Sequence, residues 1–117
     1  MTWVTGKVWE LTDSGDEADL LVLIEEQIEP RYAELHPDVR LGLMRLEGRR
    51  YLATQTWPDR ETWQRTTSGP EFERWLEHYR PVLALWGAAA TFVFEWAGEE
   101  IRGDIRGEDI RGEASRM

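Results

Sequence analysis

The chain has 117 residues, of which 41% are hydrophobic and 32% are charged, a composition typical of one soluble globular domain. Its net charge of −9 argues against nucleic acid and anionic membrane surfaces as partners, and the absence of cysteine excludes disulfides and thiolate chemistry. No apolar run approaches the ~20 residues of a membrane span, and the N-terminus lacks the features of a signal peptide. The sequence therefore predicts a cytoplasmic protein.

One strand and one helix are predicted before residue 36. The segment TWVTGKVWEL, residues 2–11, is rich in Val, Trp and Thr and alternates loosely, which is typical of a strand. From Asp16 the apolar spacing becomes helical, and it predicts a helix of about five turns that is kinked or re-phased at Pro30. The apolar stripe of this helix consists of Leu20, Leu21, Ile24, Ile28 and Leu35.

The second half of the chain predicts a hairpin, two helical segments and a last strand. VRLGLMRL and YLATQTW flank the connection EGRR, which favours a β-hairpin. Asp59 is placed to cap a short helix that contains Trp63, and Pro70 suits the first position of a second helix, which Pro81 should end or bend. ATFVFEW, residues 90–96, is the last strand. The order βαββαβ predicts an α+β, ferredoxin-like fold with a four-stranded antiparallel sheet.

A change of composition divides the chain near residue 98. Residues 1–98 form the predicted domain. Residues 99–117 repeat Ile-Arg-Gly three times with acidic residues between, and a glycine in every repeat disfavours both helix and strand. We expect a solvated low-complexity tail. The alternative is a segment that lies across a partner subunit.

The chain resembles the antibiotic biosynthesis monooxygenase family of the dimeric α/β-barrel superfamily. The resemblance covers about residues 2–97, and ATQTWPDRETWQR, SGPEFERW and the closing TFVFEW carry it. It implies a homodimer in which two four-stranded sheets face each other as a barrel, each with a small-molecule cavity between its sheet and its helices. Such families include cofactor-free oxygenases of polycyclic phenolic polyketides, haem-degrading oxygenases, and lyases, isomerases or cyclases.

The resemblance transfers one residue directly. Trp63 falls on the position of a tryptophan that is functional in both kinds of oxygenase. The companion asparagine is missing, because Thr5 and Gly6 stand near the start of the first strand and the chain contains no Asn. The haem-ligating histidine is also unmatched, since His78 comes several residues too late in SGPEFERWLEH. The sequence therefore predicts no cofactor.

The residues themselves suggest a cavity with polar walls. In this fold the first and third strands are central, yet they carry Thr5, Lys7, Thr54, Gln55 and Thr56. Buried polar side chains need hydrogen-bond partners, so these residues mark either a satisfied core or the wall of a wet cavity. On the first helix, regular helical spacing places Gln27 and Arg31 within the apolar stripe. Arg31 could clamp an anionic oxygen there or extend to water instead.

The remaining candidates are aromatic residues and one histidine. His78 would suit a base that accepts a phenolic proton if it faced the pocket, although a solvated position is the alternative. Most of the seven tryptophans are assigned to the core and the dimer interface, and Trp63 to a flat substrate. Trp63, His78 and Arg31 are the predicted catalytic residues. The predicted substrate-binding residues are Gln27, Tyr32, Tyr51, Thr54, Thr56 and Phe72.

These features predict a cofactor-independent monooxygenase acting on an aromatic or polyketide-like phenol. Two histidines without ligand spacing do not make a metal site, and no phosphate-binding glycine loop joins a strand to a helix. An electron-rich phenol supplies much of its own reactivity, so the protein need supply only a base, an apolar cavity and orientation. The same cavity could serve a cyclase or isomerase, or a non-catalytic dimeric protein that binds an aromatic metabolite.

Overall fold

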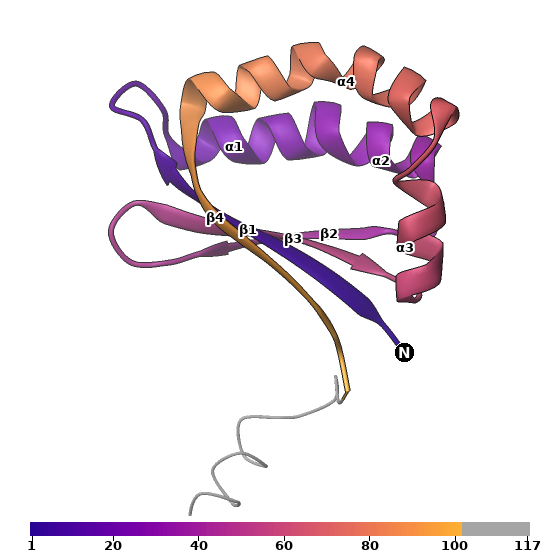
Figure 1. Ribbon diagram of the computed structural model, residues 1–117. Helices are drawn as coiled ribbons and strands as arrows, with labels where there is room; N and C mark the ends of the chain where they lie inside the picture. Colours follow the sequence, from indigo (N-terminus) through magenta and orange to yellow (C-terminus); the bar gives the residue numbers. More distant parts are fainter. Residues whose placement is uncertain (102–117) are drawn as a thin grey trace, which may run out of the picture.

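The computed structural model describes residues 1–101 and shows the α+β fold that the sequence predicts. Four antiparallel strands form one sheet in the order β2-β3-β1-β4, so β1 and β3 are central as expected. Helices α1, α2 and α4 cover one face of this sheet, and its other face carries no helix (Figure 1). In chain order the elements are β1 (Trp3–Leu11), α1 (Glu17–Leu23), η1 (Ile24–Ile28), α2 (Glu29–Leu35), β2 (Arg40–Arg45), β3 (Arg50–Trp57), α3 (Arg60–Thr66), α4 (Pro70–Ala89) and β4 (Ala90–Glu99).

Only the first three residues of the predicted tail, 99–101, lie within the described part of the chain. β4 continues beyond residue 96 to Glu99, because Ala97, Gly98 and Glu99 pair with the start of β1. The rest of the Ile-Arg-Gly segment, residues 102–117, lies outside the described residues.

The first helical layer is re-phased by a turn of π-helix just before Pro30. Asp16 and Asp19 form a capping box at the start of α1, and η1 follows directly, with the Glu29 amide donating to the Ile24 carbonyl. A turn closed in this way holds one residue more than an α-helical turn, so later residues rotate back by about one position, roughly 100°. Re-phasing is therefore found as predicted, but it begins before the proline.

This rotation changes which side chains face the sheet. Ile28 is buried and Tyr32 packs against the core, whereas Gln27 is exposed and Arg31 lies at the flank of the helix. The regular helical projection that placed Gln27 and Arg31 in the apolar stripe is wrong for this reason.

Helix α4 continues past Pro81, so the predicted end there is not observed. Its 20 residues run without interruption from Pro70 to Ala89. Pro81 cannot donate to the carbonyl one turn earlier, but it lies on the exposed side of the helix, where water can bind that carbonyl. This long helix lies alongside α1 and α2 in the layer that covers the sheet (Figure 1).

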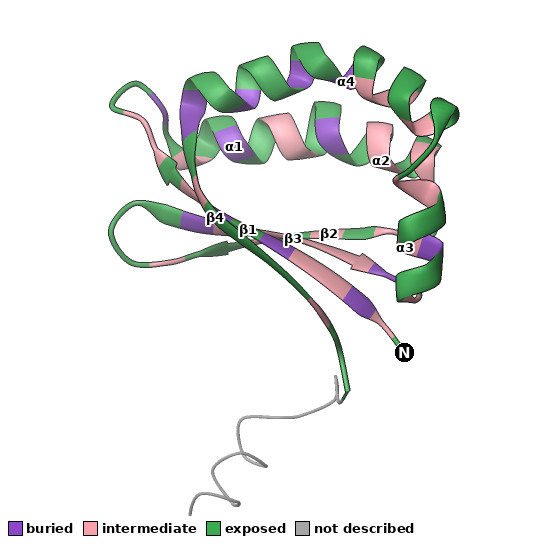
Figure 2. Cartoon of the chain, in the orientation of Figure 1, coloured by how far each residue is buried: buried purple, intermediate pink, exposed green. Residues whose placement is uncertain are grey.

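The core lies between the helix layer and the covered face of the sheet, where buried residues of both layers meet (Figure 2). Trp9 of β1 meets Trp86 of α4 edge to face, with ring centroids 5.9 Å apart. Tyr51 of β3 is buried, and its hydroxyl donates to Glu17 at 3.0 Å. Arg45 also binds Glu17, and these contacts hold the pKa of the Glu17 carboxyl below its usual value.

A β-bulge in β4 determines which aromatic side chains face the helices. The pairing of β1 with β4 shifts by one residue at Val93, because Val8 opposes Phe94 while Trp9 opposes Phe92. Phe92 therefore lies with Trp9 on the helix side, at a centroid distance of 5.5 Å. Phe94 lies on the opposite face of the sheet.

The bare face of the sheet carries an apolar row that crosses all four strands. Met44, Leu52, Val8 and Phe94 oppose one another in sequence across β2, β3, β1 and β4. The two ends of this row, Met44 and Phe94, are 58% and 51% exposed. Trp96 adds a further exposed ring on β4, where its indole lies over the position at which Gly6 lacks a side chain.

Candidate active site

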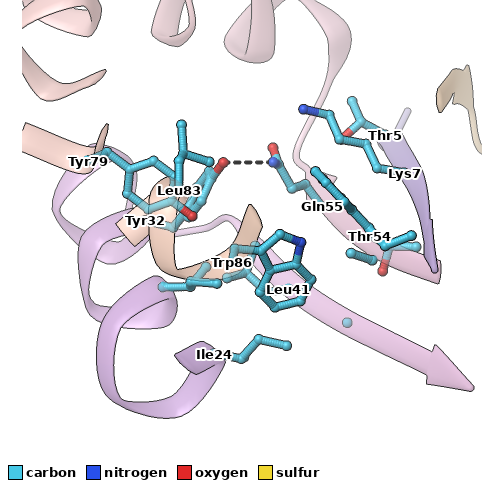
Figure 3. Close-up of a pocket in the computed structure, with 14 residues that line it drawn as sticks. Thr5, Lys7, Ile24, Tyr32, Leu41, Thr54, Gln55, Tyr79, Leu83 and Trp86 are labelled. Carbon is cyan, nitrogen blue, oxygen red and sulfur yellow. Dashed lines mark hydrogen bonds between the residues drawn. The ribbon is translucent and has the colours of Figure 1, made fainter. Parts of the chain in front are cut away.

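The space between the sheet and the helices holds an inner cavity of about 90 Å³ and an outer cleft of about 510 Å³. The two spaces are contiguous because they share six lining residues, of which all but one are polar or carry a hydroxyl. Figure 3 shows these side chains around the inner cavity. The shared residues are Thr5, Lys7, Tyr32, Gln55, Tyr79 and Leu83.

The outer cleft has an aromatic wall formed by α3 and α4. Trp75 stacks on Tyr79 at a centroid distance of 4.7 Å, and Phe72 stacks on Trp75 at 5.7 Å. These residues are three and four positions apart, so one face of α4 presents them as a continuous surface. The Trp75 indole N–H donates to the Arg31 carbonyl at 2.9 Å, which fixes the ring. A cleft of this volume and lining suits a flat ligand of several rings.

Trp63 forms the end of this wall. Asp59 begins α3 by accepting from the Thr62 amide at 2.6 Å, as the sequence predicts. Trp63 follows in the first turn of α3, is half-buried, and lines the outer cleft. Its ring packs against Trp3, with centroids 5.3 Å apart. The Arg60 guanidinium also lies over the Trp3 ring, 5.0 Å from its centroid.

A directional chain of hydrogen bonds ends at the junction of the two spaces. The Trp57 indole N–H donates to Gln55 Oε1 at 3.2 Å, and Gln55 Nε2 donates to the Tyr32 hydroxyl oxygen at 2.9 Å. Trp57 has no acceptor on its ring and is almost fully buried, so it fixes which end of the amide faces Tyr32. Burial raises the pKa of Tyr32 to about 12, and burial also raises the pKa of Tyr79. Both hydroxyls therefore stay protonated at neutral pH.

Two charged side chains line the cleft among the described residues, Lys7 of β1 and Glu95 of β4. They oppose each other across the two strands, and Lys7 Nζ lies 4.0 Å from Glu95 Oε2. Their side chains are 48% and 64% exposed, so the pair is loose and open to solvent. In Figure 3 the Lys7 side chain extends from β1 with its amino group on the side of Gln55.

The structure brings three of the predicted site residues to the cleft. Trp63 and Phe72 line the outer part, and Tyr32 lines both parts. Thr54 borders the inner part, but its side chain alternates with Gln55 and projects toward the bare face of the sheet. Tyr51 lies in the core against Glu17, and it is absent from the cleft lining. Thr56 alternates with Gln55 and therefore projects toward the bare face of the sheet.

The structure does not bring Arg31, Gln27 or His78 to the cleft. The Arg31 guanidinium lies 3.9 Å from Glu34 at the surface, on the flank to which the π-helical turn rotates it. His78 is exposed on α4, and its Nδ1 lies 2.8 Å from the Arg74 carbonyl oxygen. His78 therefore takes the solvated position that the sequence analysis left open as the alternative to a base in the pocket.

The polar cleft residues Gln55, Lys7 and Glu95 were not among the predicted site residues, although Gln55 and Lys7 were considered as the wall of a wet cavity. Gln55 and Lys7 were recognisable as polar residues on central strands, and alternation with buried neighbours could have placed both on the helix side. Glu95 could not be placed in this way, because the β-bulge at Val93 determines its pairing with Lys7.

The described part of the chain carries neither a metal-ion cluster nor a membrane-spanning helix. No group of three or more His, Cys, Asp or Glu side chains within residues 1–101 is arranged to hold a metal ion. None of the helices in that range is long and apolar enough to cross a membrane.

The comparisons with known proteins identify the fold. No protein-family model matches the chain, and no curated protein matches it by sequence. Among solved structures, a mutant of SnoaB, a cofactor-independent oxygenase from Streptomyces nogalater, superposes with a TM-score of 0.63 at 16% identity, covering 90% of this chain and 98% of that one. HapK from Hahella chejuensis gives a TM-score of 0.58 at 18% identity, over 92% and 100% of the two chains.

A third similar structure is a putative antibiotic biosynthesis monooxygenase from Chloroflexus aurantiacus, with a TM-score of 0.52 at 14% identity, over 92% of this chain and 100% of that chain. These likenesses confirm the ferredoxin-like fold and the structural resemblance to antibiotic biosynthesis monooxygenases. At such identities they establish the fold and leave the chemistry to be argued from the cleft.

Proposed function

We propose that this protein is a cofactor-independent monooxygenase that acts on an aromatic, polyketide-like phenol. The observation that carries the proposal is the outer cleft, in which Trp63 and the α4 aromatic residues provide stacking surface and polar groups gather at one end. The fold shared with a cofactor-independent oxygenase supports the same reading.

The reaction draws its electrons from the substrate. A ring CH₂ activated by a neighbouring phenol or carbonyl loses a proton, and the resulting carbanion adds O₂ through electron transfer and radical recombination. The peroxide then loses water, so two C–H bonds break, one oxygen atom becomes a carbonyl oxygen, and the other leaves in water. The protein contributes orientation of the ring and stabilisation of the anion in a largely apolar space.

We further propose that the working form is a homodimer joined through the bare face of the sheet. The apolar row of Met44, Leu52, Val8 and Phe94, together with Trp96, leaves exposed large hydrophobic side chains on this face. Contiguous exposed apolar surface of this kind is typical of protein interfaces. A second copy packed face to face through the same surface would complete a closed barrel.

Oxygen consumption with a panel of anthrones and polycyclic hydroquinones tests the catalytic proposal. We expect purified protein to consume one O₂ per substrate converted, above the rate of buffer alone and without added flavin, haem or metal. Conversion at the same rate under argon would instead indicate a cyclase or isomerase. Binding of these compounds without any conversion would indicate a dimeric binding protein.

A further inference from the structure

We propose that the junction of the two spaces, which Lys7 and Tyr32 both line, binds an anionic oxygen carried by a flat aromatic ligand. This inference rests on the proposed function in that it takes the ligand to be aromatic, and it adds the charge and the position of its polar group. The volumes set the orientation, because the ring system fits the outer cleft of about 510 Å³ and the inner cavity of about 90 Å³ takes only a small substituent.

Lys7 provides the cationic side of this site. It is the single lysine of the chain, which contains thirteen arginines, and it lines both the cavity and the cleft. An ammonium group is a compact charge with three rotatable donors, so it can follow an oxygen in several ring positions. Among the described residues that line the cleft, Lys7 is the one cation.

Tyr32 provides a neutral donor whose direction is fixed. Its oxygen accepts from Gln55 Nε2, and Gln55 cannot turn its amide over without losing the bond from Trp57. The Tyr32 hydroxyl therefore keeps its own proton for another acceptor. Because its pKa is raised to about 12, it remains a donor throughout the neutral range. Gln55 acts here as a positioning residue.

Glu95 determines the selectivity of the site. Its carboxylate lies 4.0 Å from Lys7 Nζ, a loose contact that an incoming anion must displace. A neutral ligand leaves this pair intact and gains little from Lys7. An anionic ligand gains a charge-assisted hydrogen bond but also competes with Glu95. Removing Glu95 should therefore strengthen anion binding, and removing Lys7 should weaken it.

Calorimetric binding of matched naphthalene ligands tests the proposal with the full-length protein. The probes are 2-naphthoate, the neutral isostere 2-naphthamide, and 2-naphthol, whose ionisation is followed by absorbance while it is bound. We expect 2-naphthoate to bind about tenfold more tightly than 2-naphthamide, a difference typical of one charge-assisted hydrogen bond. If the site takes phenolates as well as carboxylates, bound 2-naphthol should ionise at a lower pH than free 2-naphthol.

Substitutions of Lys7 and of Glu95 should change the preference for 2-naphthoate in opposite directions. Lys7→Gln should reduce the preference for 2-naphthoate with little effect on 2-naphthamide, and Glu95→Gln should increase it. Tyr32→Phe should weaken both ligands, 2-naphthoate more strongly because its acceptor is charged. Arg80→Gln, an exposed cation of α4, is the matched control and should change neither. In the unsubstituted protein, ¹³C-methylation labels two amines, that of Lys7, which is the single lysine, and that of the N-terminus. The Lys7 signal should shift with 2-naphthoate and stay constant with 2-naphthamide.

The outcomes separate this inference from the proposed function. Equal binding of 2-naphthoate and 2-naphthamide, or a preference that survives Lys7→Gln, would overturn the anion site and leave an aromatic cleft available for catalysis. Failure of all three probes to bind would overturn both proposals. An unshifted Lys7 signal in the presence of bound 2-naphthoate would overturn the assignment to Lys7.

Discussion

Trp63 depends on its neighbours for its position in the cleft wall. The Asp59 cap fixes the start of α3. Trp3, the first residue of β1, packs against one side of the Trp63 indole. The Trp3 indole N–H is buried without a partner, so the contact between the two rings is one of packing. A ring supported from behind and open in front is suited to stacking against a planar ligand.

Replacing Trp63 with Phe should lower turnover or ligand affinity by on the order of tenfold, about 1.4 kcal/mol, while the fold is retained. Phenylalanine keeps most of the apolar volume but loses stacking area and the indole N–H. Steady-state kinetics and thermal unfolding of the variant measure the two effects separately. His78→Gln is the control, because His78 is exposed outside the cleft and its replacement should leave kcat and its pH profile unchanged.

Sequence reasoning at the residue scale succeeded where side chains follow regular spacing. Phe72 and Trp63 were found because both lie in regular α-helix close to starts that the sequence signals, Pro70 for α4 and Asp59 for α3. Arg31 and Gln27 were misplaced because their spacing was projected on an α-helix, and the turn at Ile24–Ile28 has a different period. Pro30 signals a disturbance there but gives neither its kind nor the direction of rotation.

At the scale of the elements, the loop between β1 and α1 makes a close contact with the C-terminal end of α4. Thr12 donates from its amide and its hydroxyl to the Ala89 carbonyl, so the loop satisfies the C-terminal end of the helix. Gly15 lies against the same carbonyl, and a Cβ at this position would be 2.2 Å from the Ala89 oxygen. The order of elements was predictable from the chain, but this contact was not, because it joins residues more than seventy positions apart.

Two glycine substitutions should have opposite effects on stability. Gly15→Ala forces backbone atoms apart and should lower the free energy of unfolding by about 1–3 kcal/mol. Gly87→Ala, in α4 with open space around the position, should raise it by about 0.5–1 kcal/mol through higher helix propensity. Urea unfolding curves of the two variants measure both changes. A free energy of unfolding that Gly15→Ala leaves unchanged would show that the loop does not pack against α4 in this way.

At the scale of the whole molecule, the single helix layer leaves the sheet half covered. A domain of this size buries roughly two-thirds of the surface of its unfolded chain, and the two ends of the apolar row on the bare face, Met44 and Phe94, are left out of that burial. Burying the row against a second copy would bring this surface into a core, which makes self-association a source of stability as well as an arrangement of subunits.

Sedimentation velocity tests the dimer directly. The unsubstituted protein should sediment as a dimer at micromolar concentration, and Met44→Lys with Phe94→Lys should convert it to a monomer with a lower melting temperature. Leu85→Lys, a comparably exposed apolar residue on the helix layer, should leave the dimer intact. A monomeric unsubstituted protein, or one that only Leu85→Lys dissociates, would contradict the barrel arrangement.

The close approach of Trp3 and Trp63 has an optical consequence. Two indoles 5.3 Å apart and inclined by 35° couple their ultraviolet transitions, and the chiral environment divides the coupled absorption into circular-dichroism bands of opposite sign. These bands fall in the region used to measure helix and strand, so a spectrum interpreted only as secondary structure misstates the helix content of this chain. A second indole pair, Trp9 and Trp86, lies in the core, so a change on ligand binding reports on the pair that contains the cleft residue Trp63. A ligand that turns the Trp63 ring changes the intensity of these bands while the backbone contribution stays constant.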